Sequence, residues 1–246
     1  MKARRDFLKD TVRKEVDFRL TAQSRGYLPP PVEKPVPDGT SRIKLPRQDN
    51  WMSFGAVSLV EAVTKRSSYR KPTKGKLSFL ELSFLLWATQ GVTRKELPLH
   101  AFKVVPSAGC RHSFESYIAA IGIEGLEQGV YRYLPLSHEL IAVRECPDIG
   151  PRVTLALLGQ DFAGESAAVF FWTAIPARME WRYAEAAHKV IALDAGHVCQ
   201  NLYLAGQAAD CGICAIAAYD QELCDELVMV DGDDEFTIYA ASVSKR

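Results

Sequence analysis

The stretch Arg66-Ser67-Ser68-Tyr69-Arg70 places two arginines four residues apart, with serine hydroxyls between them. It directly follows residues 58–65, whose pattern predicts a short helix. Guanidinium groups and hydroxyls at this spacing can hold a phosphate or a polar ribityl chain through charge-assisted hydrogen bonds. Taken alone, the stretch is more often a solvated helix end, because basic residues are favoured there in any protein.

Further along the chain, Pro106-Ser107-Ala108-Gly109 predicts a rigid turn of small residues, and Glu115 follows it. Small residues let the backbone approach a flat ligand closely. The same composition is common in plain turns that enter a strand. This motif is therefore not specific by itself.

A third feature is Arg182-Tyr183, near the start of the longest predicted helix, residues 180–209. Tyr183 is a candidate proton donor if its hydroxyl faces a cavity; the alternative is a rim tyrosine that bonds to the backbone. Asp194 and His197 lie further along the same helix. Because buried polar groups must be paired, these side chains form either a structural network or a site.

The pair Cys211 and Cys214 forms a Cys-x-x-Cys motif, which occurs in redox dithiols and in zinc sites. Here it leads into an apolar strand rather than the start of a helix, and no second ligand pair has regular spacing. We therefore predict no metal site and keep a thiol redox protein as a weak alternative. No Gly-x-Ser-x-Gly, Walker A or Gly-x-Gly-x-x-Gly motif is present, which weakens hydrolase, nucleotidase and Rossmann dehydrogenase functions.

Composition excludes other classes. The 246 residues carry 30 basic and 30 acidic side chains, a net charge of zero, which argues against a nucleic-acid binder. No apolar run reaches the roughly 18–20 residues that span a bilayer, and the basic N-terminus lacks the apolar segment of a signal peptide. Six irregularly spaced cysteines form no disulfide framework. We expect a soluble, cytoplasmic protein that binds neither nucleic acid nor membrane.

The order of expected elements indicates the fold class. Residues 1–50 are interpreted as an N-terminal helix, over residues 1–20, and a Pro-rich arm, and residues 51–246 as the main domain. Helices are expected at 58–65, 78–89, 150–159, 180–209 and 221–228, and strands at 116–123, 130–133, 167–175, 213–218 and 236–243. Strands and helices mix without regular βαβ alternation, so an α+β fold is favoured over a doubly wound sheet.

Each motif is weak, but their order is specific. The order resembles the nitroreductase superfamily, and within it the SagB/ThcOx-type branch of thiazole- and oxazole-forming peptide dehydrogenases. Besides the arginine-serine and Pro-Ser-Ala-Gly motifs, the resemblance covers Leu85–Gly91, Gly125–Tyr133, His138, Arg178–Tyr183, Asp194–Asn201, Cys214–Ile216 and Val243. It implies an α+β homodimer with a mixed, mainly antiparallel sheet flanked by helices, and FMN in clefts between the subunits.

The resemblance also implies which residues contact FMN. The phosphate and ribityl chain would be held by Arg66, Ser67, Ser68 and Arg70, with Lys245 and Arg246 as basic residues near the phosphate. The loop beside the flavin, commonly contributed by the other subunit, corresponds to Pro106, Ser107, Ala108 and Gly109, with Glu115 following. Ala215, Ile216 and Ala217 match the strand end whose backbone approaches the ring system.

Function follows from the same resemblance. We expect an FMN-dependent oxidoreductase that transfers hydride between flavin and a small-molecule or peptide substrate, with Tyr183 as proton donor or acceptor and Arg182 as its electrostatic partner. Azoline-oxidising relatives have a Lys-Tyr pair where this chain has Arg182-Tyr183, and arginine cannot act as a base. The alternatives are an NAD(P)H-dependent nitro or quinone reductase, and a flavin-free binding subunit of a biosynthetic complex.

Overall fold

The computed structural model describes residues 5–54, 57–96 and 100–246. Within them, seven strands form one sheet in the order β1-β6-β5-β4-β7-β9-β8, and each pair of neighbours is antiparallel. The strands are β1 (Ile43–Lys44), β4 (Phe114–Ala120), β5 (Gly129–Leu134), β6 (Glu139–Glu145), β7 (Ala168–Ala174), β8 (Cys211–Ile216) and β9 (Phe236–Lys245), while β2 (Val92–Glu96) and β3 (His100–Lys103) form a separate hairpin.

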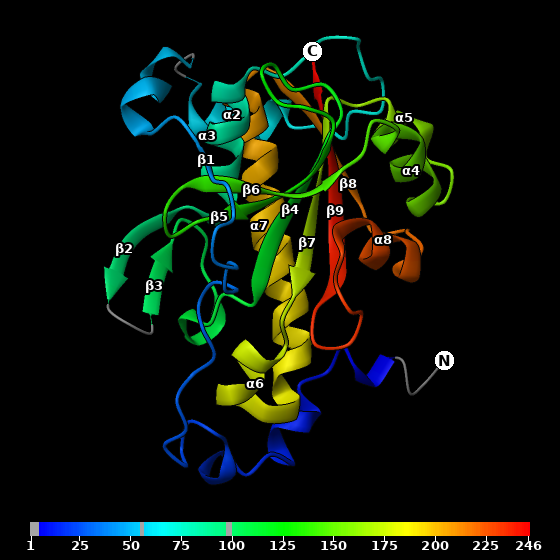
Figure 1. Ribbon diagram of the computed structural model, residues 1–246. Coiled ribbons are helices and arrows are strands. Elements are labelled where there is room, and N and C mark those ends of the chain that lie inside the picture. The colour runs from blue at the N-terminus through cyan, green and yellow to red at the C-terminus, as the bar shows by residue number, and fades with distance from the viewer. Residues whose placement is uncertain (1–4, 55–56, 97–99) are drawn as a thin grey trace.

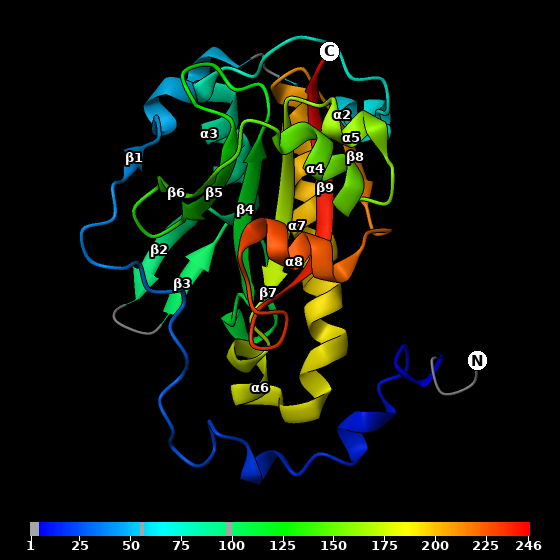
Figure 2. The same cartoon turned by 45° about the vertical axis from the view of Figure 1, so that its right-hand side comes forward.

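Helices cover both faces of the sheet (Figures 1 and 2). The α-helices are α2 (Leu59–Lys65), α3 (Phe79–Gln90), α4 (Ile149–Ala156), α5 (Asp161–Gly164), α6 (Ala177–Tyr183), α7 (Ala187–Ala208) and α8 (Gln221–Val228). Short 3-10 turns are η1 (Thr11–Lys14), η2 (Phe18–Leu20), η3 (Gln48–Ser53), η4 (Ala108–Cys110) and η5 (Ala184–Ala186).

The interior strand β7, which lies between β4 and β9, explains why helices cover both faces of the sheet. All its residues are buried, and successive side chains of a strand point to opposite faces. Phe170 and Trp172 join the core that includes α3 and α7, whereas Val169 and Phe171 join the core that includes α4, α5 and α8. A strand that is apolar on both faces therefore places α7, and the residues it carries, against one side of the sheet.

The structure confirms the α+β class and the mainly antiparallel sheet. Predicted helices that match are α2, α3, α4 and α8, and the predicted hairpin is β4–β5. Ser78 and Glu81 form a reciprocal capping box that begins α3, and Gly91 ends it. Strand β6 and the β2–β3 hairpin were not predicted. Among the described residues, no helix is both long and apolar enough to cross a membrane.

Of the predicted helix over residues 1–20, the structure describes residues 5–20, and the prediction is wrong there beyond the helical residues 5 and 6. Residues 11–14 and 18–20 form only two 3-10 turns, and the Asp17 side chain accepts from the Arg19 backbone nitrogen at 3.1 Å. Phe7 and Leu8 are 51% and 68% exposed. Without a surface to bury its apolar face, a short helical pattern does not form a stable helix.

The predicted helix over 180–209 is confirmed over α7, but its continuity is wrong. It is interrupted at Ala184, whose φ of +46° and ψ of −135° end α6, and η5 precedes α7. No glycine or proline stands there, so the sequence carries no local signal for the interruption. As a result, Arg182 and Tyr183 lie at the end of a separate short helix.

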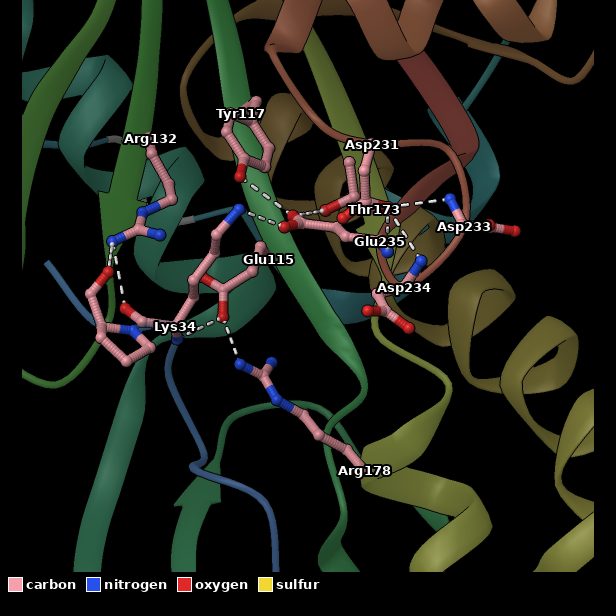
Figure 3. Close-up of polar contacts among 11 residues, drawn as sticks. Lys34, Glu115, Tyr117, Arg132, Thr173, Arg178, Asp231, Asp233, Asp234 and Glu235 are labelled. Atoms are coloured by element: carbon pink, nitrogen blue, oxygen red, sulfur yellow. Dashed lines mark hydrogen bonds and ion pairs between the residues drawn. The ribbon is translucent and has the colours of Figure 1, made fainter.

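The arm lies along the edge of the domain (Figures 1 and 2). Its strand β1 pairs with β6, and Lys34 is held by two buried carboxylates (Figure 3). The Lys34 backbone nitrogen donates to Glu115 at 2.8 Å, and its Nζ forms an ion pair with Glu235 at 2.5 Å. Arg132 donates to the carbonyl oxygens of Lys34 and Pro35 at 3.0 and 3.1 Å. The arm is therefore anchored by polar contacts as well as by strand pairing.

Candidate functional site

The segment 66–70 lies beside strand β8. Ser68 forms a parallel bridge with Ile213, and the Tyr69 backbone nitrogen donates to the Ile213 carbonyl at 2.8 Å. The approach requires Gly212, because a Cβ there would lie 2.2 Å from a ring atom of Tyr69. These contacts bring the arginine-serine motif next to the strand end that was predicted to approach the flavin.

Tyr203 on α7 connects these two segments. Its hydroxyl lies 3.0 Å from the Ser68 hydroxyl and accepts from the Ala215 backbone nitrogen at 2.9 Å. The Arg66 guanidinium stacks over its ring at 5.2 Å. We refer to Arg66, Ser68, Tyr203 and Ala215 as the phosphate-end cradle. No motif in the sequence points to Tyr203, which is a tyrosine among apolar positions of a predicted helix.

Exposure and charge in this region suit an anionic ligand. Ser67, Ser68 and Arg70 are exposed, and Arg66 is half-buried. Arg246 also reaches this region: its guanidinium is 6.0 Å from the Tyr69 ring and donates to Gln207 at 3.2 Å.

The other residues that were predicted to contact FMN differ in how accessible they are to a ligand. Lys245 is engaged elsewhere, with its Nζ on the Glu81 carboxylate and the Ala209 carbonyl. Ala215 is half-buried, Ile216 is buried in the core beside α8, and Ala217 is exposed just beyond β8. Ile216 therefore offers its backbone rather than its side chain to a ligand.

The Pro-Ser-Ala-Gly turn is held against the other end of α7. The Ala108 backbone nitrogen donates to the Asp194 carboxylate at 3.3 Å, and the His112 backbone nitrogen donates to the Ser107 hydroxyl at 2.9 Å. Burial raises the pKa of Asp194, and hydrogen bonds from Ser107 and Ala108 partly oppose this shift. Pro106 itself is exposed.

The structure brings this turn together with the Arg182-Tyr183 pair. Gly109 has φ +57°, and a Cβ at this position would lie 2.6 Å from Arg182 Cδ and 2.7 Å from the Tyr183 hydroxyl. The Arg182 guanidinium lies 5.6 Å from the Tyr183 ring centroid. We refer to Pro106–Gly109, Arg182 and Tyr183 as the ring-end group.

Glu115, predicted as a cofactor contact, lies elsewhere. It is 2% exposed and forms an ion pair with Arg178, itself 3% exposed, at 2.5 Å (Figure 3). The same carboxylate oxygen accepts from the Lys34 backbone. The structure therefore places Glu115 within the contacts that anchor the arm, because its carboxylate is buried and already paired.

The cradle contacts the C-terminal half of α7, and the Pro-Ser-Ala-Gly turn contacts its N-terminal half. Their contacts on this helix, Tyr203 and Asp194, are nine residues apart, which is about 14 Å at a rise of 1.5 Å per residue. A single chain therefore assembles each half of the predicted flavin site, but it does not bring the two halves next to each other.

The cysteine pair is buried and free. Burial raises the pKa of Cys211 to about 12 and also raises that of Cys214. A raised pKa disfavours the reactive thiolate. The described residues contain no cluster of His, Cys, Asp and Glu that could hold a metal ion.

Comparison with known proteins places this geometry in a family. The model of the nitroreductase family matches residues 63–244. A protein of Methanocaldococcus jannaschii, named as a putative nitroreductase, is 32% identical over 168 residues, which cover 68% of this chain and 82% of that protein.

Solved structures agree in fold. One named as a putative nitroreductase from Anabaena variabilis superposes with a TM-score of 0.68 at 24% identity over 89% of this chain, which spans only 44% of that protein. The E. coli microcin synthetase McbBCD complex contains a chain with a TM-score of 0.61 at 19% identity, covering 79% of this chain and 76% of that one. The family match and the identity to the archaeal relative show that this chain belongs to the nitroreductase family.

Proposed function

We propose that this chain is an FMN-dependent oxidoreductase that transfers hydride between flavin and an organic substrate. The observation that carries the proposal is the phosphate-end cradle, in which Tyr203 bonds both Ser68 and Ala215. Exposed hydroxyls and arginines next to an accessible strand end are the groups that a phosphorylated, flat cofactor requires. Membership of the nitroreductase family supports the same assignment.

The residues of the cradle fit FMN in kind. Arg66, Arg70 and Arg246 would bind the phosphate, Ser67 and Ser68 the ribityl chain, and the backbone from Ala215 to Ala217 would lie against the ring. When bound, FMN supplies the hydride acceptor and donor, while the protein supplies position and electrostatics. Lys245 would assist only by its charge, because Glu81 already holds it.

Arg182 and Tyr183 supply the polar groups beside the substrate in this proposal. The Tyr183 hydroxyl, held next to Gly109, would donate or accept a proton at its oxygen. Arg182 remains charged and would stabilise negative charge beside it. Because arginine cannot remove a proton, any base in the reaction must be a different group.

A homodimer would complete the site. We propose that the ring-end group of one subunit meets the phosphate-end cradle of the other, since one chain separates them by about 14 Å along α7. Exposed apolar residues next to the cradle support a partner surface: Leu59, Val60 and Val63 of α2 are 70%, 74% and 54% exposed.

Mixed dimers test this arrangement. Neither the Arg66→Gln nor the Tyr183→Phe homodimer should turn over substrate at the normal rate. A randomly reassembled mixture should regain about one quarter of wild-type activity, because half of its dimers carry one site with both lesions and one with neither. No recovery in verified heterodimers would place both groups in the same subunit's site.

Two substrate classes follow from different observations. Similarity in fold to a chain of the microcin synthetase complex favours oxidation of a modified peptide within a biosynthetic complex. The name given to the archaeal relative favours reduction of a nitro compound. For this alternative we propose NAD(P)H as the electron donor, with a quinone as a second acceptor. Rapid bleaching of the bound flavin by NAD(P)H under anaerobic conditions would support the reductase. Absence of bleaching, with reduction by an azoline peptide instead, would support the dehydrogenase.

The first experiment is a visible spectrum of the purified protein, with identification of any chromophore released on denaturation. Flavin bands and released FMN are expected. Tyr203→Phe should weaken FMN binding, because it leaves Ser68 and the Ala215 amide without their shared partner. Tyr219→Phe is the matched control, since it removes a single 3.1 Å bond to the Thr237 carbonyl outside the cradle. A colourless protein that also fails to take up added FMN would overturn the proposal and favour the flavin-free binding subunit.

A further inference from the structure

A pocket of about 350 Å³ lies between the N-terminal arm and the end of α6. Arg182 and Tyr183 line it from the end of α6, and Arg13 and Phe18 line it from the arm. Thr21, Gln23 and Ser24 complete the lining with polar side chains. A cavity of about 150 Å³ is enough to hold a benzene ring, so this pocket has room for a substituted aromatic molecule.

The arm forms a defined wall rather than a loose end. The Ser24 and Thr21 hydroxyls donate to the Phe18 carbonyl at 2.7 and 3.1 Å, which closes a tight turn. The Gln23 backbone nitrogen donates to the Trp181 carbonyl at 2.9 Å. The Trp181 indole nitrogen in turn donates to the Tyr27 carbonyl, also at 2.9 Å. These bonds fix the turn that carries Phe18 against α6.

The charges that line the pocket are positive. Its two charged side chains are Arg13 and Arg182, and none of the lining residues in the described part of the chain is acidic. Asp10 binds Arg13 through Nε at 2.7 Å, a contact that does not involve the two terminal nitrogens. Each guanidinium lies near an aromatic ring, Arg13 at 5.8 Å from Phe18 and Arg182 at 5.6 Å from Tyr183.

We propose that this pocket binds the organic substrate, and that the substrate is a planar aromatic compound carrying a carboxylate. The ring lies between Phe18 and Tyr183, and the carboxylate accepts hydrogen bonds from the terminal nitrogens of Arg13. The assignment rests on the proposed function for its link to hydride transfer. It makes the N-terminal arm a determinant of substrate specificity.

The experiment compares two probes of nearly equal shape, 4-nitrobenzoate and the neutral 4-nitrobenzamide, by isothermal titration calorimetry on the full-length protein as purified. The carboxylate should bind about fivefold or more tightly than the amide, which corresponds to about 1 kcal/mol for one partly exposed charge pair. Arg13→Gln should abolish this preference, and Arg13→Lys should restore part of it. Phe18→Ala should weaken both probes to a similar extent.

Arg19→Gln is the matched control. Arg19 is also an arm arginine paired with an aspartate, Asp17, but its side chain is 88% exposed and lies outside the pocket. Equal affinity for the two probes, or an unchanged preference in Arg13→Gln, would overturn the inference. Because binding is measured without turnover, this result is separate from the flavin spectrum. A protein that neither holds nor takes up FMN, yet prefers 4-nitrobenzoate, would refute the proposed function but not the pocket.

Discussion

The interruption between α6 and α7 allows a direct test of backbone strain beside Tyr183. Ala184 has φ +46° and ψ −135°, a conformation that only glycine adopts readily. Holding a non-glycine residue in such a region costs about 1–3 kcal/mol. Replacing alanine by glycine removes this cost but increases the entropy lost on folding by about 0.5–1 kcal/mol. We therefore expect Ala184→Gly to stabilise the protein by about 1 kcal/mol.

The matched control is Ala192→Gly. Ala192 is exposed in the regular part of α7, where glycine has no strain to relieve and costs about 1 kcal/mol relative to alanine. The same chemical change should thus have opposite signs at the two positions. Urea unfolding followed by circular dichroism, with the slope m checked for constancy, measures both. If Ala184→Gly destabilises the protein as much as Ala192→Gly does, Ala184 carries no strain and the reasoning fails.

Three further predictions concern buried groups. Arg178→Gln should cost about 3–5 kcal/mol in urea unfolding, because it leaves the Glu115 carboxylate buried and unpaired; a loss below 1 kcal/mol would contradict this. Burial lowers the pKa of His112 to about 3. The free energy of unfolding should therefore fall as the pH drops from about 6.5 towards 3, by at most about 1.4 kcal/mol per pH unit. His112→Gln should flatten this pH dependence. Cys211 and Cys214 should react with Ellman's reagent only after unfolding; rapid native reaction with loss of activity would favour the thiol redox alternative.

The elements that sequence analysis predicted are those with complete local signals. Helix α3 carries its own start at Ser78 and Glu81 and its own stop at Gly91. The helix over residues 1–20 was wrong because periodicity describes an apolar face without showing what buries it. The interruption at Ala184 could not be predicted, since the conformation is imposed by packing around a residue with no local preference for it.

The residues of the candidate site likewise differ in whether a local sequence signal indicates them. The arginine-serine stretch and the Pro-Ser-Ala-Gly turn are contiguous, so sequence order was enough to propose them. Tyr203 depends on contacts with residues 12 and 135 positions away, and no local pattern indicates such a partner. Glu115 follows the turn closely in sequence, yet the strand β4 carries it into the interior beside Arg178. Proximity along the chain therefore gave no signal that Glu115 is buried beside Arg178, and none for Tyr203.

The geometry of α7 gives the strongest physical reason to propose a two-chain site. Asp194 holds the Ala108 amide, and Tyr203 holds Ser68. Nine residues are two and a half turns of helix, so these side chains leave α7 on opposite sides as well as about 14 Å apart. A ligand in the cradle would have to pass around the helix to reach the turn of its own chain. A two-fold partner would avoid this path if it presented its own turn, held by its own aspartate, to the open side of the cradle.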